Sequence, residues 1–145
     1  MNLRDQLARV ISGDSRFTIE AYLFVFESLK QARGQKLRKR RKQARLRKKS
    51  SRSESNMSPS LESAHVTGRE LCLALRRLAV RNYGLMAATV LATWGLRSTS
   101  DIGDLVYRLI ESGDFSKTAR DKRSDFDDVF DFQTDLRPKS LVSDE

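Results

Sequence analysis

Few residues of this chain are suited to catalysis or to metal binding. Its 145 residues include one cysteine, Cys72, and one histidine, His65. A single cysteine excludes a disulfide framework and a cysteine-rich zinc module, and a single histidine removes most acid–base, nucleophilic and metal chemistry. We therefore expect no enzyme activity, no cofactor and no bound metal ion.

Long hydrophobic runs are also missing. The longest nearly unbroken apolar run covers residues 21–26, which is far too short to cross a bilayer. Residues 1–11 mix apolar and charged side chains and lack the apolar core and cleavage site of a leader peptide. These features predict a soluble, cytoplasmic protein with no membrane partner.

Positive charge is concentrated in one part of the chain. The net charge is +9, yet 13 basic residues and no acidic residue lie between Lys30 and Arg52, which leaves 15 basic and 19 acidic residues elsewhere. Basic runs of this density commonly act as arms that bind polyanions. The composition thus indicates an acidic body that carries a basic arm.

Composition and hydrophobic periodicity divide the chain into four parts. Residues 1–32 are expected to form N-terminal helices that pack on the core. Residues 33–60 are expected to form a basic and then serine-rich insertion that is disordered in the free chain and that could fold as a helix when phosphates neutralise its charge. Residues 61–136 predict three helices followed by a short β-hairpin, and residues 137–145 a polar tail. The expected fold class is mainly α, a helical bundle with a winged-helix-like C-terminal part.

The N-terminal part contains two helical patterns. Residues 3–11 have apolar residues at helical spacing, and a loop from Ser12 to Ser15 ends this pattern. A second helix is predicted over residues 18–32, with Thr18 as its N-cap. This segment is apolar on nearly all sides, so a buried strand over residues 21–26 is the alternative.

The helices of the third part have clear start and stop signals. Thr67 and Glu70 have the spacing of a capping box and predict a helix over residues 68–82. A second helix is predicted over residues 85–94, and a third from residues 98–100, which supply candidate caps, to about residue 112. Glycines mark the ends of these helices, at Gly84, Gly95 and Gly113.

The chain after these helices alternates between aromatic and polar residues. Phe115 and Phe126 lie in two short runs that a charged stretch separates, which suggests the hairpin. Three helices, the junction Leu-Ile-Glu-Ser-Gly-Asp-Phe-Ser-Lys at residues 109–117 and a hairpin together resemble the winged helix-turn-helix family. In that family the third helix commonly ends in an apolar pair, a Glu and a Gly before a strand leads into the wing. The resemblance covers residues 67–132.

Several segments outside the basic insertion share a second resemblance. They are Tyr-Leu-Phe-Val at residues 22–25, His-Val-Thr-Gly-Arg-Glu-Leu at 65–71, Tyr-Gly-Leu-Met-Ala at 83–87 and Trp-Gly-Leu-Arg-Ser-Thr at 94–99, with shorter matches at 116–118, 125–126 and 131–132. As a whole the chain resembles a small uncharacterised family of conserved hypothetical proteins from planctomycete and verrucomicrobial bacteria. This resemblance implies a domain boundary at the basic insertion and no particular activity.

The basic insertion is the strongest indication of function. Its lysines and arginines would neutralise phosphates and release counterions, and no aromatic residue is present there to stack on bases. We therefore expect sequence-indifferent binding to RNA, a ribosome surface or DNA. The candidate contacts are Lys36, Arg38, Lys39, Arg40, Arg41, Lys42, Arg45, Arg47, Lys48 and Lys49.

The third helix of the winged-helix-like part suggests a different function. A helix that reads a DNA groove presents basic or amide side chains, but here the face carries acids, which repel phosphates. This pattern favours an adaptor that contacts another protein, with the basic arm incidental. The candidate contacts are Asp104, Tyr107, Arg108 and Glu111.

Overall fold

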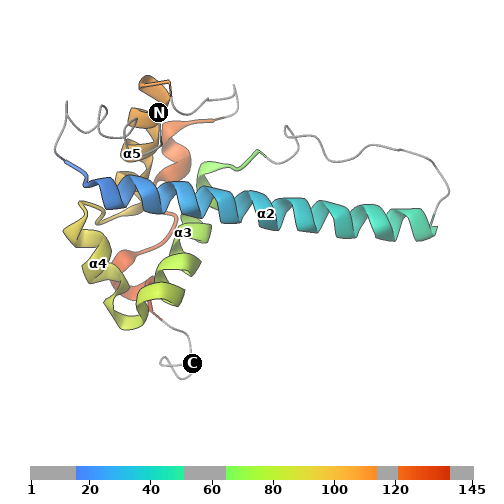
Figure 1. Ribbon diagram of the computed structural model, residues 1–145, viewed down its shortest axis with the longest axis horizontal. Helices are drawn as coiled ribbons and strands as arrows, with labels where there is room; N and C mark the ends of the chain where they lie inside the picture. The colour runs from blue at the N-terminus through green and yellow to red at the C-terminus, as the bar shows by residue number, and fades with distance from the viewer. Residues whose placement is uncertain (1–15, 51–64, 114–120, 138–145) are drawn as a thin grey trace.

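The described part of the protein consists of helices and turns (Figure 1). The computed structural model describes residues 16–50, 65–113 and 121–137. The expected mainly α class is confirmed, and no helix in these three ranges is both long and apolar enough to cross a membrane. The elements are α2 (Ile19–Ser50), α3 (Gly68–Tyr83), η2 (Gly84–Met86), α4 (Ala87–Thr93), α5 (Thr99–Glu111), η3 (Arg123–Phe126) and α6 (Phe132–Asp135).

Helix α2 is the longest element and has two distinct halves. It begins where the sequence predicts, since Oγ1 of Thr18 accepts a hydrogen bond from the backbone N–H of Ala21. Its first half buries a face that includes Tyr22 and Val25. Figure 1 shows this half crossing the bundle, and the second half projecting beyond it. A helix over residues 21–26 also removes the alternative of a buried strand there.

The helical second half of α2 differs from the disordered segment expected over residues 33–60. The helix continues to Ser50, and residues 51–60 lie outside the described part of the chain. Lys, Arg, Gln, Ala and Leu all have high intrinsic helix propensity, and residues 33–50 contain no proline and no β-branched residue. Continuing a helix that is already nucleated also avoids the cost of starting a new one.

The predicted capping signals of α3 and α5 are confirmed. Thr67 accepts a hydrogen bond from the backbone N–H of Glu70, and the Glu70 carboxylate accepts one from the backbone N–H of Thr67. Ser98 caps α5 through the backbone N–H of Asp101. The segment predicted as one helix over residues 85–94 is divided in two. Its first residues belong to the 3-10 helix η2, and the α-helix α4 begins at Ala87.

One core holds the first half of α2 against the C-terminal helices. Aromatic rings line the side of this core near α4. The ring centroid of Trp94 lies 5.5 Å from that of Phe24 and 5.9 Å from that of Tyr83. This packing places α2 across α3. The fully buried large side chains include Phe17, Tyr22, Val25, Leu75, Leu91, Leu96, Ile102, Leu105, Leu109 and Leu136.

The expected β-hairpin and winged-helix arrangement are not supported. Residues 121–137 form η3, turns and α6, and no strand occurs in the three described ranges, while the first arm around Phe115 lies outside them. Aspartates close local turns here: Asp125 accepts a hydrogen bond from the backbone of Lys122, and Asp131 caps α6. Such local bonds compete with strand pairing. The helix expected over residues 3–11 also lies outside the described residues.

Candidate nucleic-acid interface

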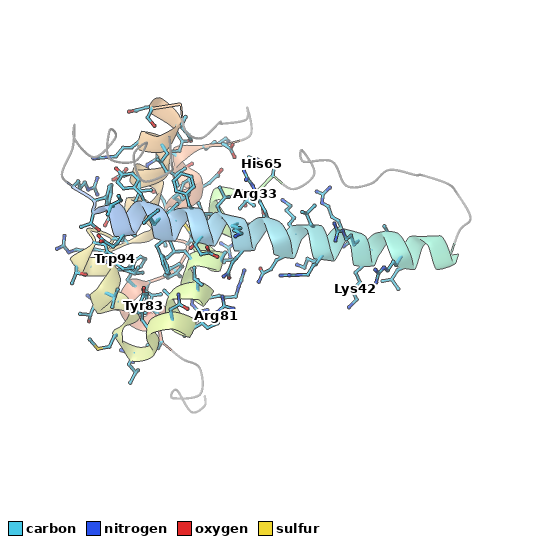
Figure 2. The ribbon with its side chains drawn as sticks, in the orientation of Figure 1. Arg33, Lys42, His65, Arg81, Tyr83 and Trp94 are labelled. Atoms are coloured by element: carbon cyan, nitrogen blue, oxygen red, sulfur yellow. The ribbon has the colours of Figure 1, made fainter. Side chains whose placement is uncertain are left out.

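The projecting half of α2 presents a dense set of positive charges to solvent. All side chains of residues 38–46 are exposed, and Figure 2 shows Lys42 extending from the helix beyond the bundle. Residues 47–49 belong to the same helix, but the side chains of Arg47, Lys48 and Lys49 lie outside the described part. The described predicted contacts in this half are Arg38, Lys39, Arg40, Arg41, Lys42 and Arg45.

These six residues surround the helix. Arg38, Lys42 and Arg45 are separated by four and three residues, so they lie on one face. Lys39 and Arg40 follow Arg38 at successive steps of about 100° and therefore point to other sides. Like charges at this spacing repel one another, and a bound polyanion would relieve that repulsion.

Lys36 has a different environment from the other predicted contacts. Its Nζ lies 2.9 Å from Oε1 of Glu70 and donates to the backbone carbonyl of His65. The pKa of Glu70 is lowered on balance, because hydrogen bonds from Thr67 and Lys36 outweigh the effect of burial, which alone raises it. Lys36 therefore ties α2 to the capped start of α3 and directs its charge toward the body.

Two arginines of α3 lie against α2 at the base of the projecting half. Nη2 of Arg77 donates to Oε1 of Gln35 at 2.7 Å, and Nη2 of Arg81 donates to Oε1 of Gln31 at 2.9 Å. Figure 2 shows Arg81 and Lys42 on the same side of α2. Neither arginine is among the contacts predicted from the sequence, because no local pattern specifies that residues 77 and 81 meet residues 35 and 31.

A notch between α2 and α3 joins the two sets of basic residues. It has a volume of about 480 Å³. Glu70 is the only acidic residue among the described residues that line it, and Lys36 already neutralises this carboxylate. The notch can thus accept an anionic group beside apolar side-chain stems. The lining residues are Ala32, Gln35, Lys36, Arg38, Lys39, Lys42, Glu70, Leu73 and Arg77.

The four predicted protein-contact residues of α5 come together on another face. Asp104, Tyr107, Arg108 and Glu111 line a depression of about 380 Å³ with Arg16. Asp104 is paired within the molecule, with Nη1 of Arg16 at 2.6 Å and with Arg123. Arg108 lies over the ring of Phe17, 5.1 Å from its centroid. Glu111 is exposed at the end of the helix.

The single histidine, His65, and the single cysteine, Cys72, both lie near the start of α3. Nε2 of His65 lies 3.0 Å from Oδ1 of Asp121 beside the start of α3. Cys72 is fully buried, and burial raises the pKa of its thiol to about 12, so the thiol stays protonated at neutral pH. No group of three His, Cys, Asp or Glu residues able to hold a metal ion occurs among the residues that the structure describes.

Comparison with known proteins provides no relative for this chain. No family model, no curated protein and no solved structure matches it. The geometry and charge of the chain's own residues are therefore the basis for inferring its function.

Proposed function

We propose that this protein is a non-enzymatic binder of nucleic acid that holds the sugar–phosphate backbone of RNA, a ribosome surface or DNA through the projecting half of α2. One observation carries the proposal: residues 38–46 form an exposed helix with six basic side chains and no acidic one. Phosphates are the abundant polyanions that such a helix would attract, and their binding releases condensed counterions.

The helical form of this segment strengthens the binding expected from its charge. A disordered arm loses backbone entropy when it orders on a partner, whereas a helix has already paid most of that cost. No aromatic residue lies between Lys30 and Arg52, so base stacking makes no contribution there. The proposed binding is therefore sensitive to salt and indifferent to base sequence. We propose that the protein meets these partners in the cytoplasm.

A variant that lacks the six basic side chains of residues 38–46 tests this proposal directly. Replacing these six exposed residues with glutamine keeps helix propensity and removes their six positive charges. We expect the variant to lose at least about 100-fold in affinity for a fluorescently labelled 20-nucleotide RNA or DNA at 50 mM salt, since each lost phosphate contact lowers the salt-dependent part of the free energy. The changes are Arg38→Gln, Lys39→Gln, Arg40→Gln, Arg41→Gln, Lys42→Gln and Arg45→Gln.

The matched control exchanges lysine and arginine at the same six positions and leaves the charge unchanged. It should bind within a few-fold of the wild type with the same salt dependence. Circular dichroism would check that both variants remain helical. Wild-type affinity in the glutamine variant would reject the proposal.

A second candidate function is a protein–protein adaptor, which the depression beside α5 favours. Tyr107 and Glu111 line this depression, and tyrosine is enriched among the residues that contribute most to binding in protein interfaces. Because Asp104 holds two arginines of its own chain, changing it would disturb the fold. The sharper test is Glu111→Lys, which reverses an exposed charge. The adaptor proposal expects a co-purifying protein that this variant loses, and it fails if pull-downs recover none.

A further inference from the structure

Arg77 and Arg81 of α3 have donors left over after their contacts with α2. Each guanidinium group has five N–H donors, and each uses one on a glutamine of α2, Gln35 or Gln31. Both arginine side chains are exposed. The glutamines therefore hold the two arginines beside α2 and leave their charge accessible to an anion.

The glutamine contacts align these arginines with the basic residues of α2. Positions 31, 35, 38, 42 and 45 of α2 are separated by four, three, four and three residues, so they share one face. The glutamines at positions 31 and 35 each accept a hydrogen bond from an arginine of α3. Positions 38, 42 and 45 are themselves basic residues. The result is one row, in the order Arg81, Arg77, Arg38, Lys42 and Arg45.

No unpaired acid interrupts this row at the notch. Glu70 is the acidic residue that lines the notch, and its carboxylate is paired with Lys36 and with the backbone N–H of Thr67. Lys36 thus acts as a positioning residue, because it neutralises Glu70 and links α2 to the start of α3.

We infer that the row is a binding track for one continuous sugar–phosphate strand, in which α3 anchors the strand at the base of α2. This inference rests on the proposed function and extends its site onto the body of the protein. From position 31 to position 45 the helix rises about 21 Å. Five cations spread over this length can neutralise several successive phosphates of one strand.

The double variant Arg77→Gln/Arg81→Gln tests the track. Affinity for a labelled 20-base-pair DNA duplex and for the corresponding single strand would be measured from 50 to 300 mM salt. We expect the slope of log K against log salt to become shallower by about 1.8 for the duplex and about 1.4 for the single strand, as for two lost phosphate contacts. The two arms show whether the strand is held alone or within a duplex.

Two controls separate this track from a general effect of charge. Arg77→Lys/Arg81→Lys keeps both cations and should keep the slope. Arg97→Gln/Arg137→Gln removes two exposed arginines outside the row, one in the α4–α5 turn and one after α6, and should also keep it. Urea unfolding would check that every variant remains folded.

The outcomes distinguish this inference from the proposed function. An unchanged slope in Arg77→Gln/Arg81→Gln, or an equal loss in Arg97→Gln/Arg137→Gln, overturns the track. If the six-glutamine variant of α2 still loses binding in that case, the proposed function stands and its site is confined to α2. If that variant binds as the wild type does, the proposed function itself is wrong.

Discussion

At the scale of single residues, Asp104 links three segments of the molecule. It pairs with Arg16 from the segment before α2 and with Arg123 of η3, while Arg123 also donates to the backbone carbonyl of Ser100. Burial alone raises the pKa of Asp104, but hydrogen bonds from Arg123 and Arg16 lower it on balance. The Asp104 carboxylate, which the sequence predicts as a contact with a partner protein, thus joins the segment before α2 to η3.

This pairing predicts a pH-dependent contribution to stability. Because the pKa of Asp104 is lower in the folded than in the unfolded state, its contribution is complete above the unfolded value of about 3.9 and is lost as the pH falls through the folded value. We expect Asp104→Asn to lower the free energy of unfolding by about 1 kcal/mol at pH 7, with a smaller difference near pH 3.

Urea unfolding between pH 7 and pH 3 would measure this difference. Asp128→Asn is the matched control, since Asp128 is an exposed aspartate with φ 50°, a conformation that asparagine tolerates. It should change stability by less than about 0.5 kcal/mol. A constant Asp104→Asn deficit over the whole pH range would contradict the proposed role of the ionised carboxylate.

At the scale of elements, two helical glycines have opposite roles. Gly34 lies inside α2 where a Cβ would meet no atom within 4 Å. Gly103 lies inside α5 where a Cβ would come within 2.7 Å of Cβ of Phe126 in η3. The first glycine only weakens its helix, whereas the second allows two elements to approach closely.

These roles predict alanine substitutions of opposite sign. Gly34→Ala should raise the free energy of unfolding by about 0.5–1 kcal/mol, because alanine has the higher helix propensity. Gly103→Ala should lower it by about 1–3 kcal/mol, because Phe126 must move away from α5. Thermal or urea unfolding would measure both. A stabilising Gly103→Ala would show that η3 is not packed on α5 as described.

At the scale of the whole molecule, the basic helix and the remaining chain carry opposite net charge. The +9 total combines 13 basic residues between Lys30 and Arg52 with an excess of acids elsewhere. Because the projecting half of α2 extends away from the bundle, a polyanion can reach it at a distance from most of those acids. The geometry thus favours binding along α2 over binding across the bundle.

Wild-type binding should therefore depend steeply on salt. If about six phosphates are engaged, affinity falls about a thousandfold between 50 and 200 mM salt. RNA and DNA oligonucleotides of different base sequence should bind within a few-fold of one another, as fluorescence anisotropy would show. A strong preference for one sequence, or a flat salt response, would contradict backbone binding through α2.

Much of the local structure follows from short-range sequence signals. Thr67 with Glu70 predicts the start of α3, Ser98 the start of α5, and Thr18 the start of α2, because each cap involves residues three positions apart. The position of the basic segment is likewise evident from composition. Composition does not decide whether that segment is helical, since helix propensity and charge repulsion oppose each other there, and the helix up to Ser50 differs from the disorder predicted for the free chain.

Contacts between distant residues were decided by the tertiary structure alone. Arg77 and Gln35 are 42 positions apart, and Arg16 and Asp104 are 88 apart, so no local pattern specifies that they meet. The same holds for η3, where Phe126 packs against Gly103 and local turns replace the expected hairpin. The sequence by itself determined where helices start and where positive charge gathers, because both depend on neighbouring residues. The packing of α2 across α3 decided which charges align and which are neutralised, because that depends on which faces the core brings together.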